Sequence, residues 1–289
     1  MDTFGNIVTA MVTPFDYKGN IDLAKTTQLV EHLIENGSDS LVVAGTTGES
    51  PTLSTEEKIA LFQHVVKVVD GRAKIIAGTG SNNTYASIEL TKRAEKIGVD
   101  GVLLVSPYYN KPNQQGLYEH FKAIADSTSL PVMLYNIPGR TAVTISIDTI
   151  VKLSEIPNIV AIKESTGDIA AATEIISKTD DQFMLYSGDD YMTLPFLSIG
   201  AKGVVSVAAH IIGNEMQEMI TAYQQGEHMK AAQLHQQLMP IMNGLFIAPN
   251  PTPVKTALQM KGMDVGSVRL PLVPLSIEER TTLTNILNQ

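Results

Sequence analysis

The sequence predicts a (β/α)8 barrel, an α/β fold in which eight parallel strands close into a ring and helices surround it. Three observations support this fold class. Eight short apolar runs, rich in β-branched residues, recur along the chain, and such continuous apolar runs are typical of strands that are covered on both faces. Stretches with a helical pattern fill the gaps, so that one strand and one helix repeat about every 20 to 35 residues. Eight units favour a closed barrel, whereas five or six would favour an open, doubly wound sheet.

The expected strands are short, and helices are expected between them. In chain order the strands are Ile7–Thr13, Ser40–Ala44, Lys74–Gly78, Val102–Ser106, Val132–Asn136, Ile159–Lys163, Phe183–Ser187 and Gly203–Val207. A helical period is clearest at Ile59, Phe62, Val66 and Val69. Ser54 stands three residues before Glu57, and this capping-box spacing predicts the start of that helix. Glycines stand where helices should end, at Gly37, Gly98 and Gly226.

The alternation of strands and helices ends after the eighth strand. From about Gly213 onward the sequence has only helical patterns, and the expected C-terminal helices are Gly226–Asn243, Pro253–Lys261 and Ser276–Asn288. The last of these opens with a second capping-box spacing, from Ser276 to Glu279. Residues 248–253, which hold three prolines, predict a stiff connection. We therefore expect a barrel over residues 1–225 and a helical extension over residues 226–289, packed together as one structural unit.

The composition excludes several classes of function. The chain of 289 residues contains no cysteine, which rules out thiol catalysis, disulfides and thiolate metal sites. Its formal net charge of −9 argues against a nucleic-acid partner, because an acidic surface repels phosphates. The first residues lack the basic and apolar regions of a signal peptide, and no apolar run is long enough to span a membrane. We expect a cytoplasmic protein with no membrane partner.

Lys163 is the most informative candidate for a catalytic residue. In a barrel of this kind the active site lies at the C-terminal ends of the strands, and Lys163 ends the otherwise apolar strand Ile159–Lys163. An amine that is partly withdrawn from water is freed as a nucleophile, which is what Schiff-base chemistry with a carbonyl needs. The plainer interpretation is a strand-end lysine whose amine reaches solvent. Glu164 is adjacent in sequence, but strand alternation should direct it to the opposite face.

Tyr135 is expected beside Lys163, because it lies near the end of the neighbouring strand. A phenol at that position can pass a proton to or from a substrate. The alternative is a core aromatic whose hydroxyl reaches the rim. Since adjacent strands of a barrel would bring the two side chains to the same level, the pair is a stronger indication of chemistry than either residue alone.

Three further positions suggest binding of anions. Thr46 and Thr47 lie in a glycine-flanked turn, where hydroxyls and exposed backbone N–H groups can hold a carboxylate. The same composition also fits an ordinary polar turn. Arg140 follows Pro138-Gly139 and suits bidentate pairing with a second carboxylate, unless it is simply a solvated loop arginine.

The Asp189-Asp190 pair, which follows the seventh strand, fits either a helix N-cap or a position at the rim.

Three segments together resemble one known family. They are Gly45-Thr46-Thr47-Gly48-Glu49, Tyr135-Asn136-Ile137-Pro138-Gly139-Arg140 and Ile162-Lys163-Glu164-Ser165. In this order and spacing they resemble the pyruvate-dependent class I aldolase and lyase family, and the resemblance runs over essentially the whole length. It implies a (β/α)8 barrel in which Lys163 forms a Schiff base with pyruvate. Among the reactions of the family, the motifs fit best the condensation of pyruvate with L-aspartate 4-semialdehyde, on the route to diaminopimelate and lysine.

The resemblance also implies roles for individual residues, but no metal and no organic cofactor. Tyr135 matches the central proton donor and acceptor of the family, while Thr46 and Tyr109 match the rest of its proton relay. Thr47 matches the contact to the pyruvate carboxylate, and Arg140 the contact to the carboxylate of the semialdehyde. Backbone contacts near the keto acid are implied at Gly188 and Val205.

The resemblance implies self-association as well. Members of the family usually form homotetramers built as dimers of dimers, and the tyrosine that Tyr109 matches reaches into the active site of a neighbouring subunit. A shared Tyr109 requires at least a homodimer. The sequence alone does not separate a dimer from a tetramer.

Two alternative functions remain at this level. The nearest is another lyase of the same family, such as N-acetylneuraminate lyase or a 2-keto-3-deoxy sugar acid aldolase. These enzymes would share Lys163 and Tyr135, but Thr47, Tyr109 and Arg140 fit the semialdehyde reaction better. The second alternative is a barrel that senses a keto acid without turnover. A damaged proton relay would be expected there, whereas this chain keeps all its members.

One feature of the sequence departs from the pattern of the lysine-inhibited members. Where sensitive bacterial enzymes carry a histidine and a glutamate at a subunit interface, this chain has Lys58 and Ala86. Asn82 and Tyr108 are retained. Loss of a carboxylate and gain of a cation should weaken binding of the lysine ammonium group. We therefore expect weak or absent feedback inhibition by lysine.

Overall fold

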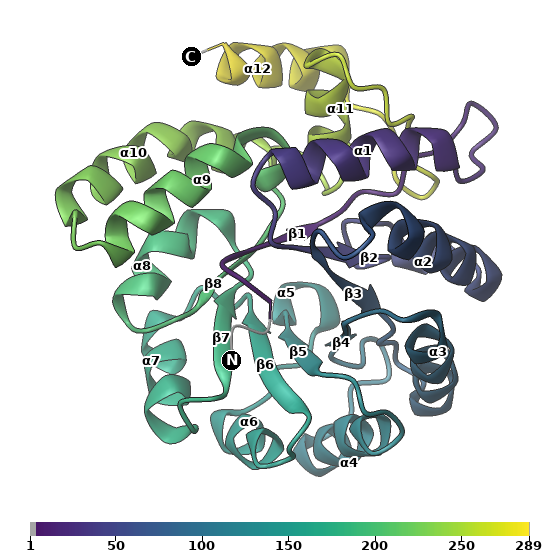
Figure 1. Cartoon of the computed structure of the whole chain (residues 1–289), viewed down its shortest axis with the longest axis vertical. Helices are drawn as coiled ribbons and strands as arrows, with labels where there is room; N and C mark the ends of the chain where they lie inside the picture. The colour runs from purple at the N-terminus through teal and green to yellow at the C-terminus, as the bar shows by residue number, and fades with distance from the viewer. Residues whose placement is uncertain (1–3, 289) are drawn as a thin grey trace.

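The fold is a closed barrel of eight parallel strands, as the sequence predicts (Figure 1). It is seen in a computed structural model that describes residues 4–288. Each strand pairs with the next in chain order, and β8 closes the ring by pairing with β1. The strands are β1 (Ile7–Ala10), β2 (Ser40–Val43), β3 (Lys74–Gly78), β4 (Gly101–Val105), β5 (Val132–Asn136), β6 (Ile159–Glu164), β7 (Met184–Ser187) and β8 (Gly203–Ser206).

Strand alternation divides the buried side chains into two cores. One core fills the inside of the ring and takes one residue or two from each strand, including Val8, Val42, Ile76, Leu103, Met133, Tyr135, Ala161, Tyr186 and Val205. The other, larger core lies between the strands and the helices. Since alternate residues of a strand share a face, Lys163 shares the inward face with Ala161, whereas Ile162 packs in the outer core. The site residues of β5 and β6 are thereby directed into the ring.

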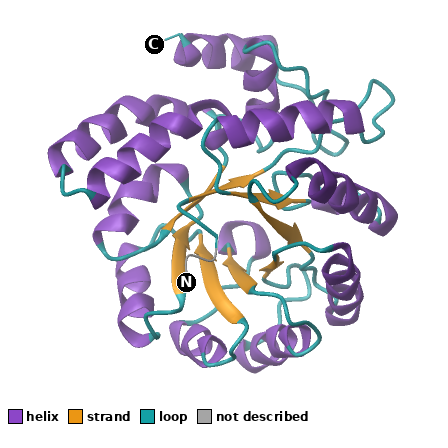
Figure 2. Cartoon of the chain, in the orientation of Figure 1, coloured by secondary structure: helices purple, strands orange, loops and turns teal. Residues whose placement is uncertain are grey.

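Helices surround the strands on all sides of the ring (Figure 2). They are α1 (Leu23–Glu35), α2 (Thr55–Val69), α3 (Thr84–Ile97), α4 (Gln114–Ala125), α6 (Ile147–Ser154), α7 (Ile169–Lys178), α8 (Thr193–Ser198) and α9 (Ala209–Gln224). The predicted capping box at the start of α2 is confirmed: Ser54 Oγ accepts from Glu57 N, and the Glu57 carboxylate accepts from Ser54 N. The helix ends expected at glycines are also confirmed, since Gly37, Gly98 and Gly226 all have positive φ next to a helix end.

Three short helical segments lie in loops that follow strands. They are η1 (Ser50–Thr52), α5 (Pro138–Thr141) and η2 (Asp190–Met192). The sequence does not predict them, because three or four residues are too few for a helical period to be recognised. They matter because they belong to the β2, β5 and β7 loops, which also carry Thr46, Arg140 and Gly188.

The C-terminal part of the described chain is helical, as expected. It consists of α10 (His228–Gly244), α11 (Thr252–Met260) and α12 (Ile277–Leu287), and the capping box from Ser276 to Glu279 is present. Helix α10 lies alongside α9, whereas α11 and α12 lie on the same side of the barrel as α1 (Figure 1). The division of the chain at residue 225 stays a prediction.

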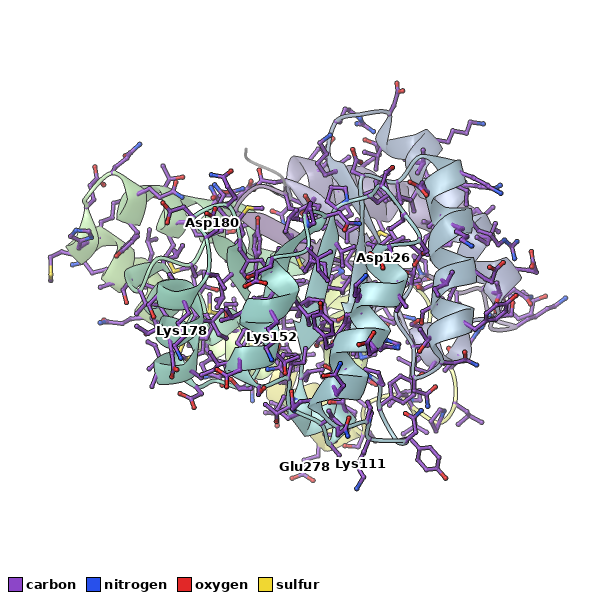
Figure 3. All side chains as sticks on the ribbon, turned by 90° about the horizontal axis from the view of Figure 1, so that it is seen from below. Lys111, Asp126, Lys152, Lys178, Asp180 and Glu278 are labelled. Carbon is purple, nitrogen blue, oxygen red and sulfur yellow. The ribbon has the colours of Figure 1, made fainter. Side chains whose placement is uncertain are left out.

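Charged side chains project outward from the helices that surround the barrel. Lys152 on α6 and Lys178 on α7 are examples (Figure 3). Exposed ion pairs also join neighbouring helices, namely Arg93 of α3 with Glu56 of α2 at 2.8 Å and Lys230 of α10 with Glu218 of α9 at 2.9 Å. Pairs of this kind contribute little to stability. Across residues 4–288 we find no helix with the length and apolar character that a membrane span requires.

Candidate active site

Tyr135 and Lys163 lie side by side inside the barrel. They are directly paired in the register of β5 and β6, and the exposed fractions of the two residues are only 4% and 5%. Lys163 Nζ is 4.2 Å from the centroid of the Tyr135 ring, a distance at which a cation is attracted to an aromatic face. The adjacency predicted from strand order is thus confirmed, and it brings an amine and a phenol together in a site largely closed to water.

Glu164 does not act as the counter-ion of Lys163. It points away from the inside of the ring, where its carboxylate accepts hydrogen bonds from Asn136 Nδ2 at 2.9 Å and from the Thr166 N–H at 2.8 Å. Burial raises the pKa of Glu164 above its ordinary value, although these hydrogen bonds oppose the shift. The prediction that strand alternation separates Glu164 from Lys163 agrees with these contacts.

Two aspartates of the loop after β7 lie within the electrostatic range of Lys163. Burial raises the pKa of Asp189, and it raises the pKa of Asp190 to about 6, while the Lys163 charge lowers both. Asp190 ties the loop after β7 to the end of β8, because its carboxylate accepts hydrogen bonds from Ser206 Oγ and from the backbone N–H groups of Val207 and Ala208. Asp189 stands at the N-cap of η2, but its side chain makes no capping hydrogen bond there.

Gly188 lies against the Lys163 side chain, and the site has no room for a larger residue. A Cβ added at Gly188 would lie 1.8 Å from Ser165 Oγ and 2.9 Å from Lys163 Cε. Its N–H donates to the Glu164 carbonyl at 2.7 Å, which holds the loop close to β6. Val205 is buried in the inner core of the barrel, on β8. Gly188, just after the end of β7, and Val205, within β8, therefore lie on the two strand units that follow Lys163 around the ring.

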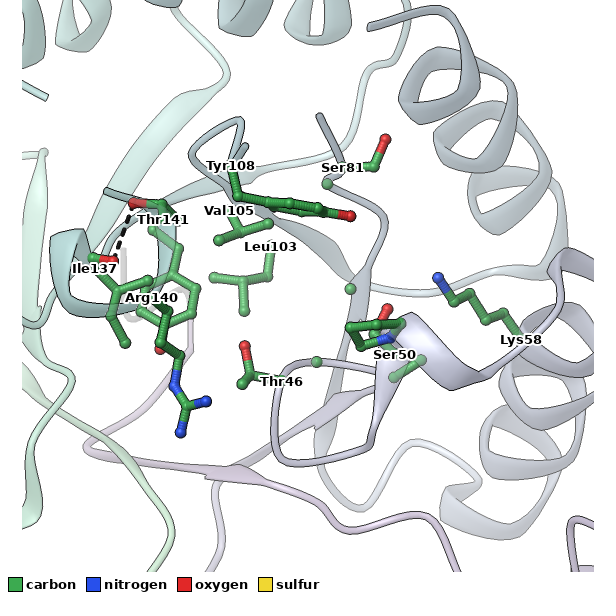
Figure 4. Close-up of a pocket in the computed structure, with 16 residues that line it drawn as sticks. Thr46, Ser50, Lys58, Ser81, Leu103, Val105, Tyr108, Ile137, Arg140 and Thr141 are labelled. Carbon is green, nitrogen blue, oxygen red and sulfur yellow. Dashed lines mark hydrogen bonds between the residues drawn. The ribbon is translucent and has the colours of Figure 1, made fainter. Parts of the chain in front are cut away.

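A cavity of about 260 Å³ opens beside Tyr135 (Figure 4). Thr46 and Arg140 line it, with Arg140 at one end and Lys58 at the other. Burial lowers the pKa of Lys58. The lining contains two cationic side chains and no carboxylate, so it suits an anionic ligand. Lys163 itself does not line this cavity, and Tyr135 is the member of the pair that faces it.

The loop after β2 is held in place by close packing and by the C-terminal part of the chain. Ala44 has a φ of +54°, and its carbonyl oxygen lies only 2.4 Å from the position of a Cβ at Gly78, so β3 must end in glycine at this level. Thr47 is buried, and its Oγ1 accepts from Asn250 Nδ2 at 2.9 Å. The carboxylate of Glu49, also buried, accepts from Lys255 Nζ at 2.6 Å.

Asn250 and Lys255 support the loop after β2, and the sequence does not predict these contacts. They stand 203 and 206 positions from their partners. No local pattern connects residues so far apart, and only the fold brings them together. The sequence predicts a stiff, proline-rich connection and a helix at these positions, and in the structure a side chain of each reaches the loop after β2.

Tyr109 is the one predicted relay residue that a single chain does not bring to the site. It is 89% exposed, has a φ of +69° and does not line the cavity, whereas its neighbour Tyr108 does. The contribution of Tyr109 to the active site of a neighbouring subunit stays a prediction. In the part of the chain from residue 4 to residue 288, no group of three or more His, Asp or Glu side chains could hold a metal ion.

The fold and the site define the class of protein: a (β/α)8 barrel with a buried lysine and tyrosine paired inside the ring. The sequence model of the dihydrodipicolinate synthetase family matches residues 3–289, and the chain belongs to this family. The chain is 63% identical over 285 residues to the 4-hydroxy-tetrahydrodipicolinate synthase of Bacillus velezensis, with 99% of each chain covered.

Solved structures agree with this assignment. The crystal structure of a dihydrodipicolinate synthase from Bacillus anthracis has a TM-score of 0.98 and 66% identity, covering 100% of this chain and 99% of that one. A dihydrodipicolinate synthase from Acinetobacter baumannii, solved in complex with pyruvate, has a TM-score of 0.96 and 44% identity, with coverage of 99% and 98%.

Proposed function

We propose that the protein is a 4-hydroxy-tetrahydrodipicolinate synthase, which condenses pyruvate with L-aspartate 4-semialdehyde through a Schiff base at Lys163. The observation that carries the proposal is the buried Lys163–Tyr135 pair beside a cavity lined by cations and free of carboxylates. The name of the Bacillus velezensis relative and the pyruvate in the Acinetobacter baumannii structure support it.

The first half of the reaction uses the amine of Lys163. The amine attacks the ketone carbon of pyruvate, a C–N bond forms, and the ketone oxygen leaves as water after it has received two protons. Tyr135, whose ring centroid lies 4.2 Å from Lys163 Nζ, would deliver and recover these protons. The protonated imine then withdraws electrons, so that the methyl group loses a proton and an enamine forms.

The second half forms a carbon–carbon bond and a ring. The enamine carbon attacks the aldehyde carbon of the semialdehyde, and the aldehyde oxygen becomes the hydroxyl group of the product. The amine of the semialdehyde then attacks the imine carbon and displaces Lys163, which releases 4-hydroxy-tetrahydrodipicolinate and the free enzyme. Arg140 lies at the end of the cavity and would hold the semialdehyde carboxylate through two parallel hydrogen bonds.

The remaining site residues position the substrates and move protons. Thr46, which lines the cavity, would carry protons between Tyr135 and Tyr109 of a neighbouring subunit. Thr47 would bind the pyruvate carboxylate, next to backbone groups of Gly188 and Val205. This assignment requires self-association, as a homodimer or a homotetramer, because Tyr109 projects away from the site of its own chain. A role in lysine and diaminopimelate biosynthesis is consistent with a cytoplasmic location.

The proposal is tested by a coupled assay. Purified protein is mixed with pyruvate and L-aspartate 4-semialdehyde, and dihydrodipicolinate reductase converts the product with consumption of NADPH. We expect turnover by the wild type and none by the Lys163→Ala variant. If the wild type is inactive while the substrates and the coupling enzyme are verified, the synthase assignment is wrong, and cleavage of sugar acids is the next reaction to measure.

A further inference from the structure

Asn250 reaches from the C-terminal part of the chain to the loop that carries Thr46 and Thr47. It lies between α10 and α11, and its Nδ2 donates to Thr47 Oγ1 at 2.9 Å. Both residues are buried, with exposed fractions of 7% for Asn250 and 3% for Thr47. Since water does not reach this hydrogen bond, it cannot replace either partner when that partner is removed.

This contact constrains the direction in which the Thr47 hydroxyl can donate. A hydroxyl has one proton and two lone pairs, and the amide of Asn250 occupies a lone pair without taking the proton. Among the described residues, no protein group accepts the Thr47 proton. The hydroxyl is therefore left as a donor, which is the role that binding of a carboxylate requires.

We infer that Asn250 is a positioning residue that holds the Thr47 hydroxyl ready to donate to the carboxylate of the keto acid. This inference rests on the proposed function, and it adds that the C-terminal segment completes the pyruvate half of the site. Asn250 acts through Thr47 and does not need to touch the substrate.

The side-chain carbonyl oxygen of Asn250 also supports this assignment. Asn250 Oδ1 is buried and has no hydrogen-bond partner among residues 4–288. A buried acceptor without a hydrogen bond destabilises the fold, so an asparagine at this position is a poor choice for stability alone. Its amide does, however, offer a donor to Thr47, which an aspartate cannot do.

The segment is also anchored independently of Asn250. Lys255, on the first turns of α11, forms a buried ion pair with Glu49 and donates to the Ser267 carbonyl. Arg269 N donates to the same Glu49 carboxylate at 2.8 Å. A substitution of Asn250 should therefore leave the C-terminal segment in place, and its effect should be confined to Thr47.

The test uses two variants, Asn250→Ala and Asn250→Asp. The first removes the donor, and the second keeps the shape but replaces the donor by an acceptor that would take the Thr47 proton. We expect the KM for pyruvate to rise by about tenfold or more, more for Asn250→Asp, with little change in the KM for the semialdehyde. Thr256→Val is the matched control, because Thr256 is equally buried but bonds only to the Thr252 carbonyl within α11. It should leave both KM values unchanged.

A second measurement separates positioning from damage to the fold. The pyruvate concentration for half-maximal trapping by borohydride is compared in wild type, Asn250→Ala, Thr47→Val and the double variant. If Asn250 acts through Thr47, the double variant should resemble Thr47→Val, whereas additive losses would contradict the inference. An unchanged half-saturation in Asn250→Ala would overturn the inference alone. Absence of trapping in the wild type would overturn it together with the proposed function.

Discussion

Lys163 Nζ lies 4.2 Å from the centre of the Tyr135 ring, and the two residues are directly paired across β5 and β6. The barrel itself fixes this relationship, because the register of two neighbouring strands sets the relative height of their side chains. The amine and the phenol are therefore preorganised, and no loop has to close to bring them together.

Tyr135→Phe should separate catalysis from packing. The ring stays in the inner core and against Lys163, but the hydroxyl that we propose as the proton donor and acceptor is lost. We expect kcat to fall by about 10² to 10⁴, with a melting temperature close to that of the wild type. The coupled assay and a thermal melt measure both quantities. A Tyr135→Phe enzyme with wild-type kcat would show that Tyr135 does not move the proton.

Gly188→Ala should disable the site by displacing Lys163. The new methyl group would meet Ser165 Oγ at 1.8 Å and Lys163 Cε at 2.9 Å, and a shift of about 1 Å in a reacting group can cost about 100-fold in rate. Gly139→Ala is a matched control, since Gly139 lies in α5 and a Cβ there has no atom within 4 Å. Steady-state kinetics of the two variants should differ strongly. Equal activities would mean that the loop after β7 yields without disturbing Lys163.

The buried Glu49–Lys255 pair should matter more for stability than any exposed ion pair. The side chains of Lys255 and Glu49 are 2% and 0% exposed, and burial lowers the pKa of Lys255 to about 8 even though Glu49 opposes the shift. Lys255→Met leaves the buried Glu49 carboxylate without its cationic partner, so we expect the free energy of unfolding to fall by about 3–5 kcal/mol.

Urea unfolding of two further variants checks the expected loss in the free energy of unfolding. The double variant Glu49→Gln/Lys255→Met removes both charges and should recover part of the loss. Arg93→Ala breaks the exposed pair with Glu56 and should cost about 1 kcal/mol or less. A Lys255→Met protein as stable as Arg93→Ala would contradict this account.

His210 should make the fold sensitive to acid. Its ring joins the ends of β1 and β8, since Nδ1–H donates to the Val207 carbonyl at 2.8 Å and Nε2 accepts from the Val12 N–H at 3.1 Å. Burial lowers the pKa of His210 from 6.5 to about 4, and His32 nearby acts in the same direction. Because its pKa is lowered, the neutral His210 ring contributes its full share of stability above pH 6.5. That share is lost as the pH falls from 6.5 through 4. In that window the loss approaches about 1.4 kcal/mol per pH unit.

Other buried groups modify the acid response. Burial also lowers the pKa of His120 to about 4, which adds to the loss. Asp190, whose pKa is raised to about 6, acts in the opposite direction, because its contribution grows as the pH falls from 6 towards 3.8. His210→Gln keeps a donor and an acceptor without a titrating ring, and should flatten the decline in urea stability between pH 6.5 and 4. An unchanged slope would exclude His210 as a cause.

Lysine should inhibit this enzyme weakly or not at all. At the two subunit-interface positions that the resemblance assigns to the lysine site, this chain has Lys58 and Ala86, so the ammonium group of lysine would meet a cation and find no carboxylate there. The check is the coupled assay over a range of lysine concentrations. Inhibition at sub-millimolar lysine would contradict the prediction.

Much of the barrel follows from local sequence patterns. Parallel strands covered on both faces are continuous apolar runs, so all eight were predicted within a few residues of their observed bounds. The adjacency of Tyr135 and Lys163 followed from strand order alone. By contrast, the contacts of Asn250 with Thr47 and of Lys255 with Glu49 join residues more than 200 positions apart. Their local sequences are ordinary, and only the packing of the C-terminal segment on the barrel brings these partners into contact.

Asp190 shows a different limit of prediction. Its position after the seventh strand suggested an N-cap or a residue at the rim. Instead its carboxylate binds groups of the next strand and loop, at Ser206, Val207 and Ala208. Tertiary contacts decide between the possible partners of a buried carboxylate, and a sequence pattern cannot specify them.

The measurement that tests the central claim most directly is trapping of the Schiff base. The protein is incubated with pyruvate and sodium borohydride, digested, and analysed by mass spectrometry. We expect one reduced pyruvate adduct per chain, on the peptide that carries Lys163, and no adduct in the Lys163→Ala variant. An unmodified Lys163 peptide, or an adduct on another lysine that persists in Lys163→Ala, would show that Lys163 is not the nucleophile.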